Sequence, residues 1–108
     1  PFDIAINAIA PGFVKTRLHE QTMAAGALAG DFLERTREVM ELGGVSPEVG
    51  ARAAASLVSD AARGVTGKFV AAPYDDYAAW GEHLAELRDS DIFTLRRIVP
   101  RERGMDWQ

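Results

Sequence analysis

The residue types that most often carry catalysis are few in this chain and are not spaced for it. There is no cysteine, which excludes disulfides, zinc–thiolate sites and thiol nucleophiles. The histidines, His19 and His83, have no second metal-type ligand at a suitable spacing, so we expect both to be solvated surface residues. The carboxylates of Asp75 and Asp76 would point apart in an extended chain, which argues against joint acid–base work. We therefore predict no catalytic and no metal-binding residue within this chain.

The segment from Asn7 to Thr16 is the exception, with the letters N-A-I-A-P-G-F-V-K-T. Its Pro11 ends the apolar run of residues 2–10, which predicts a buried strand, and Gly12 has no Cβ to keep a ligand away from the backbone. In an open α/β sheet, ligands bind beyond the carboxyl ends of the strands. The plainer alternative is a strand-ending turn in which Thr16 only caps a helix.

This segment resembles the signature N-A-x-x-P-G-x-V-x-T of the short-chain dehydrogenase/reductase family, and the order of features agrees over residues 2–72. The resemblance implies hydride transfer between NAD or NADP and an alcohol or carbonyl substrate. It also implies that main-chain groups of Val14 hold the nicotinamide carboxamide, while Thr16 contacts the carboxamide or the pyrophosphate. The cofactor-binding residues expected on this basis are Pro11, Gly12, Phe13, Val14 and Thr16.

The other motifs of that family are not found in this sequence. Tyr74 is followed four residues later by Ala78, and Tyr77 by Gly81, so neither begins a Y-x-x-x-K pair. The resemblance therefore implies that the catalytic tyrosine, lysine and serine lie upstream. We expect the chain to be a C-terminal fragment of an enzyme and to be inactive by itself. A non-catalytic interaction module, or an inactive relative of the family, stays open, as do the substrate and the choice of NAD or NADP.

The expected architecture is α/β, the C-terminal portion of a doubly wound parallel-sheet (Rossmann-type) domain. Its expected regions are a strand with the nicotinamide loop (2–16), a substrate-covering region (17–45), the last large helix and strand (46–72), and a C-terminal extension (73–108). The sequence predicts helices over Asp31–Leu42, Pro47–Arg63 and about Tyr77–Leu87, a second strand over Val65–Ala72, and a loop with short helical pieces over Phe13–Gly30. Asp31 and Ser46 are the expected N-caps of the first two helices.

Composition restricts the partners further. The 108 residues include 16 acidic and 12 basic side chains, a net charge of −4, which argues against nucleic-acid binding by gross electrostatics. No apolar run is long enough to span a membrane, and the lack of cysteine fits a cytoplasmic location. The alanine-rich stretch predicts a homo-oligomer assembled through Val49–Ala72. We expect the arginines from Arg96 onward to form a solvated tail, balanced by Asp89, Asp91 and Asp106.

Overall fold

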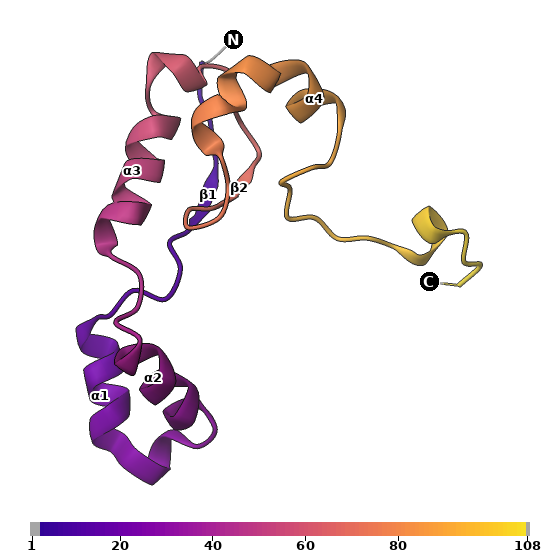
Figure 1. The fold of residues 1–108 in the computed structure, drawn as a ribbon. Coiled ribbons are helices and arrows are strands. Elements are labelled where there is room, and N and C mark those ends of the chain that lie inside the picture. Colours follow the sequence, from indigo (N-terminus) through magenta and orange to yellow (C-terminus); the bar gives the residue numbers. More distant parts are fainter. Residues whose placement is uncertain (1–2, 108) are drawn as a thin grey trace.

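The computed structural model describes residues 3–107. A short parallel sheet in it pairs a segment near the start of the chain with a segment about 60 residues later. Strand β1 (Ala8–Ala10) pairs in parallel with strand β2 (Phe69–Ala71), with Ile9 opposite Val70. The connection between the strands contains helices α1 (Arg17–Ala25), α2 (Phe32–Glu41) and α3 (Pro47–Leu57). Figure 1 shows α3 beside the sheet and the α1–α2 pair apart from it. The chain is thus mixed α/β with a parallel sheet, as expected.

Strand β1 is shorter and more exposed than the sequence predicts. Phe2 lies outside the described residues, and residues 3–7 are not part of the strand. The side chains of Ile4 and Ile6 are 70% and 74% exposed, so the prediction of a strand covered on both faces is wrong for the described chain. The sheet has two strands within residues 3–107, so the chain offers no further strand to cover the segment that leads into β1.

Helix α3 begins where the sequence predicts and ends earlier. Ser46 is its N-cap, and the Ser46 hydroxyl accepts a hydrogen bond from the Glu48 N–H at 3.3 Å. The predicted continuation to Arg63 is wrong, because the helix stops at Leu57. Beyond it, the Ser59 hydroxyl donates to the Ser56 carbonyl at 2.6 Å, and a short 3₁₀ turn follows over Asp60–Ala62.

The region predicted as a loop with short helical pieces is more regular than that. It contains the nine-residue helix α1 and a 3₁₀ turn over Gly26–Ala29, and α1 packs against α2. Asp31 does precede α2, but its side chain makes no capping hydrogen bond, so its predicted capping role is wrong. Gly43, with a φ of 87°, follows the end of α2, as the sequence predicts.

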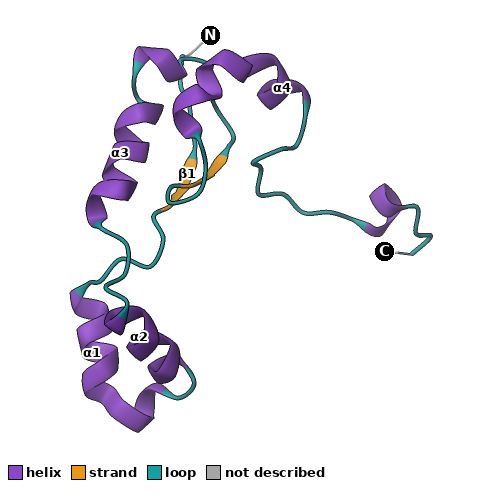
Figure 2. Ribbon diagram, in the orientation of Figure 1, coloured by secondary structure: helices purple, strands orange, loops and turns teal. Residues whose placement is uncertain are grey.

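The core lies between α3, β2 and the segment after β2. Its buried apolar residues are Ala53, Ala62, Val65, Val70, Ala72, Trp80 and Leu87. The predicted helix near residues 77–87 is divided into a 3₁₀ helix (Tyr77–His83) and helix α4 (Leu84–Asp89), and the second strand is shorter than predicted. Figure 2 shows the tail beyond α4 as loop with one short helical turn. Within residues 3–107, no helix has both the length and the apolar character needed to cross a membrane.

Candidate functional site

The segment of residues 11–16 lies at the carboxyl end of β1, at the boundary between the sheet and the α1–α2 pair (Figure 1). It runs beside the returning segment of residues 43–46. The Val45 N–H donates to the Phe13 carbonyl at 2.8 Å, and Val14 and Val45 form an isolated parallel β-bridge. A Cβ added to Gly44 would lie 2.8 Å from the Phe13 oxygen, which shows how closely the two segments pass. All the predicted cofactor residues therefore lie in one restrained turn.

The main chain of Val14 is left available by this pairing. In a parallel bridge, one of the two residues uses its own N–H and C=O, and these groups bond to the residues before and after its partner. The partner's own N–H and C=O therefore point away from the bridge. Here Phe13 supplies the carbonyl to Val45, and neither the N–H nor the C=O of Val14 has a hydrogen-bond partner within residues 3–107. An adjacent donor and acceptor on a restrained backbone can hold a primary amide, which presents the complementary pair.

The structure gives Pro11 and Gly12 roles in packing. A Cβ added to Gly12 would lie 2.8 Å from the Pro73 Cγ and 2.9 Å from a Val45 methyl carbon, and the φ of Gly12 is +83°. A Cβ added to Gly50 of α3 would lie 3.0 Å from the Pro11 Cβ. Glycine is therefore required at position 12, and it is favoured at position 50 beside Pro11, by the close approach of neighbouring elements, whether or not a ligand also comes near.

Thr16 and Phe13 meet at a side chain that the sequence analysis did not assign to the site. Thr16 is the N-cap of α1 and forms a reciprocal capping box with His19, and its hydroxyl lies 3.0 Å from His19 Nδ1. The Thr16 backbone N–H donates to the same His19 Nδ1 at 3.3 Å. The rings of Phe13 and His19 pack with their centroids 4.1 Å apart. His19 thus contacts two of the five predicted cofactor residues.

His19 is a partly exposed residue, but its ring is also hydrogen-bonded to Thr16, which the expectation of a merely solvated side chain did not include. The signal that could have found it is the spacing T-x-x-H at a helix start, a variant of the capping box in which histidine replaces glutamate or glutamine. His83 is exposed, in agreement with the prediction, and lies 3.5 Å from Glu86. The Asp75 carboxylate accepts from the Ala71 N–H at 2.7 Å, so it caps the turn after β2.

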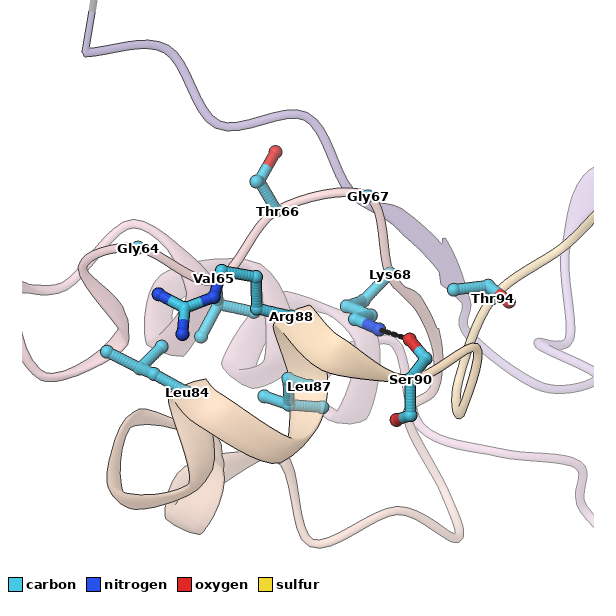
Figure 3. Close-up of a pocket in the computed structure, with 10 residues that line it drawn as sticks. All are labelled: Gly64, Val65, Thr66, Gly67, Lys68, Leu84, Leu87, Arg88, Ser90 and Thr94. Atoms are coloured by element: carbon cyan, nitrogen blue, oxygen red, sulfur yellow. Dashed lines mark hydrogen bonds between the residues drawn. The ribbon is translucent and has the colours of Figure 1, made fainter.

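A cavity of about 500 Å³ lies elsewhere, at the end of the sheet where the chain enters β2. Figure 3 shows the Lys68 ammonium directed toward the Ser90 carbonyl, and it donates to the carbonyls of Ser90 and Ile92 at 3.4 and 2.9 Å. Arg88, also in the lining, pairs with Asp89 at 2.9 Å. Both cations are thus engaged by the chain itself, and Lys68 fastens the segment after α4 to the sheet.

Comparison with known proteins finds a matching protein family. A family model described as enoyl-(acyl carrier protein) reductase matches residues 1–72, which include β1, the segment 11–16, helices α1 to α3 and β2. No curated protein and no solved structure matches the chain significantly. The matched range ends directly after β2, so the core residues of the 3₁₀ helix and α4 lie outside it.

Proposed function

The chain belongs to the enoyl-(acyl carrier protein) reductase family of short-chain dehydrogenases/reductases, and from this premise we propose that residues 11–16 bind the nicotinamide end of NAD or NADP. The complete protein would be a doubly wound α/β oxidoreductase. It would transfer hydride between the cofactor and an alcohol or carbonyl substrate, with the α1–α2 pair covering that substrate. The family's description adds a second substrate class, an enoyl group carried on acyl carrier protein.

The observation that carries this proposal is the free main chain of Val14 at the carboxyl end of β1. The nicotinamide carboxamide has N–H donors and a C=O acceptor, which fit the Val14 C=O and N–H respectively. The bridge to Val45 holds this backbone in place, so little conformational freedom would be lost on binding. The cofactor, when bound, would supply the hydride chemistry, and these residues would orient its reactive ring.

The acid–base residues of the reaction are proposed to come from another part of the same protein. The sequence contains no Y-x-x-x-K pair. The second edge of β1 has no strand partner within residues 3–107, and Ile4 and Ile6 lie exposed just before it. The radius of gyration is 18.2 Å, whereas a compact domain of this length would have about 13 Å. An upstream part of the sheet would cover this apolar edge.

The test is a cofactor titration, followed by fluorescence, of the intact protein that carries this chain. Thr16→Ala should weaken the affinity for the reduced cofactor up to about tenfold, the worth of one hydrogen bond to a polar ligand. Thr22→Ala is the matched control, because Thr22 lies near the middle of α1, between its ends at Arg17 and Ala25, and its hydroxyl donates to the Leu18 carbonyl. Equal affinities of Thr16→Ala and the unmodified protein would contradict the proposal.

A non-catalytic relative is the alternative function, and turnover distinguishes the two. The intact protein should oxidise the reduced cofactor in the presence of one member of a panel of ketones, aldehydes and enoyl thioesters. Cofactor binding with no turnover on any member of the panel would favour the non-catalytic alternative. Absence of both binding and turnover would favour an interaction module.

A further inference from the structure

We propose that His19 is a positioning residue that holds the Thr16 hydroxyl as a hydrogen-bond acceptor toward the cofactor. The inference rests on the proposed function, and it adds a residue and a chemical preference to it. Thr16 would then accept from the amino group of the carboxamide and would not bind a pyrophosphate oxygen. The proposal stands on the two contacts of His19 Nδ1 and on the packing of its ring.

The first step concerns the protonation of the ring. A backbone N–H can only donate, so the bond from the Thr16 N–H to His19 Nδ1 requires an unprotonated Nδ1. The ring proton therefore lies on Nε2. The Thr16 hydroxyl is 3.0 Å from the same Nδ1, and an unprotonated nitrogen can only accept from it. The hydroxyl proton is consequently directed to the imidazole. One oxygen lone pair faces the His19 backbone N–H of the capping box, and the other is left to accept from a ligand.

The second step concerns what holds the ring in place. Phe13 packs on His19 at a centroid distance of 4.1 Å and an angle of 38° between the ring planes. The His19 backbone is fixed in the first turn of α1, where its N–H donates to the Thr16 carbonyl at 2.9 Å. Phe13 is fixed in turn by the bond from the Val45 N–H to its carbonyl. The imidazole is thus held from both sides.

The third step concerns what such a hydroxyl can bind. A threonine hydroxyl whose proton is already used can only accept, so it favours N–H groups and disfavours phosphate oxygens, which are acceptors too. At the nicotinamide end of the cofactor, the carboxamide NH₂ is the donor of this kind. Thr16 and the free C=O of Val14 would together satisfy its two hydrogens.

The experiment compares two cofactors in the intact protein. One is reduced NAD or NADP, whichever the unmodified protein binds more tightly, and the other is its acetylpyridine analogue, in which a methyl group replaces the NH₂. Thr16→Ala and His19→Ala should each weaken the natural cofactor several-fold, up to about tenfold, and change the analogue less than twofold. His19→Gln should retain the affinity to within about twofold, because its amide oxygen can accept both hydrogens. His83→Ala is the matched control at the other, exposed histidine.

The outcomes separate the inference from the proposed function. An unchanged affinity in Thr16→Ala contradicts the cofactor assignment itself. Weakening in Thr16→Ala but not in His19→Ala overturns the role of His19 alone. Equal weakening of both cofactors by His19→Ala shows a general structural effect and overturns the donor preference. If His19→Ala does not fold, nitrogen NMR of the unmodified protein decides, since a proton on Nδ1 at a pH above the histidine titration contradicts the proposal.

Discussion

Gly12 is placed where two different restrictions act on one residue. Its φ of +83° disfavours any side chain, and an added Cβ would also meet Pro73 and Val45 at 2.8 and 2.9 Å. Gly43 has a similar φ of +87° with no atom within 4 Å of such a Cβ, so it carries the first restriction alone. The left-handed conformation costs about 1–2 kcal/mol for a non-glycine residue, and overpacking typically adds about 1–3 kcal/mol.

We therefore predict that Gly12→Ala lowers the free energy of unfolding by about 1–3 kcal/mol more than Gly43→Ala. Urea denaturation of both variants measures this difference directly. Equal losses would mean that the contacts around Gly12 can yield. Any effect of Gly12 substitution on cofactor affinity has to be interpreted against this loss of stability.

In the tail, Arg96 bonds two carboxylates, Asp91 at 2.7 Å and Glu102 at 2.5 Å. These hydrogen bonds from Arg96 hold the pKa of Asp91 and the pKa of Glu102 below their usual values. Because each pKa is lowered in the folded tail, the stabilisation is present above the ordinary carboxyl pKa. It is lost as the pH falls through the lowered one. The tail should loosen only in that acidic range.

Replacing Arg96 by glutamine should raise the pKa of both carboxyl groups toward their usual values. NMR titration of the side-chain carboxyl carbons measures each group separately. Glu86 is the internal control, because the pKa of its carboxyl is lowered by its own backbone and by His83, neither of which involves Arg96. Unchanged titration of Asp91 and Glu102 would show that the ion pairs do not persist in solution.

For single residues, the sequence predicts the roles that depend on neighbouring positions in the chain. The segment Pro11–Thr16 could be picked out because proline, glycine and threonine stand at fixed spacing after an apolar run. The spacing T-x-x-H could have paired His19 with Thr16, but the contact of His19 with Phe13 could not be predicted, because it depends on the Phe13 ring being turned toward α1. In the tail, Asp91 does balance Arg96 as predicted, whereas Asp89 pairs with its neighbour Arg88.

Helix α3 is the element whose start is set most locally. The Ser46 hydroxyl satisfies the Glu48 N–H, and Pro47 fills the first helical position, where no N–H partner is needed. We predict that Ser46→Ala lowers the free energy of unfolding by about 1 kcal/mol, while Ser46→Asn, which can cap equally well, changes it little. Thermal unfolding of the two variants measures the effect. An equal loss in both would contradict a capping role.

Helix α3 and both strands were predicted too long, the helix at its end and the strands mainly at their starts. The alanine-rich pattern after Pro47 continues to Ala62, but the Ser59 hydroxyl competes for the Ser56 carbonyl and the helix is already over. The length of a strand depends on the neighbouring strands with which it can pair. Here β1 and β2 pair over three residues each, so both strands are shorter than their apolar runs. Residue propensities do not distinguish a 3₁₀ helix from an α-helix, so the division of residues 77–89 into these two types could not be predicted from the sequence.

For the whole molecule, we predict that the 108-residue chain by itself shows no cofactor-dependent turnover with any alcohol, ketone or enoyl substrate. The physical reason is that it contains no tyrosine–lysine pair to move the proton that accompanies hydride transfer. Spectrophotometric assays of purified chain, with mass spectrometry to exclude longer contaminants, test this. Turnover above background would show that other residues of the chain carry the chemistry.

Association is the second property of the whole molecule. Ala54 and Ala55 of α3 are exposed and small, and Val58 just beyond the helix is 86% exposed. Such a surface lets another subunit approach closely, so we expect the intact protein to be a homo-oligomer through Val49–Ala72. Arginine at Ala54 or Ala55 should shift the mass measured by sedimentation toward the monomer. Arginine at Ala85, an exposed alanine of α4, should not. An unchanged mass in the double variant would place the interface elsewhere.

The pairing of residues 11–15 with residues 43–46 has a consequence for how such a protein can change over generations. Because Val14 and Val45 lie side by side, the point where the chain leaves β1 and the point where it enters α3 are close together. The excursion between them can be exchanged as a unit without altering the spacing of β1 and α3. A helix pair of different length or composition, grafted between Thr16 and Gly43, should leave the sheet intact. It should change which substrates can bind next to residues 11–16.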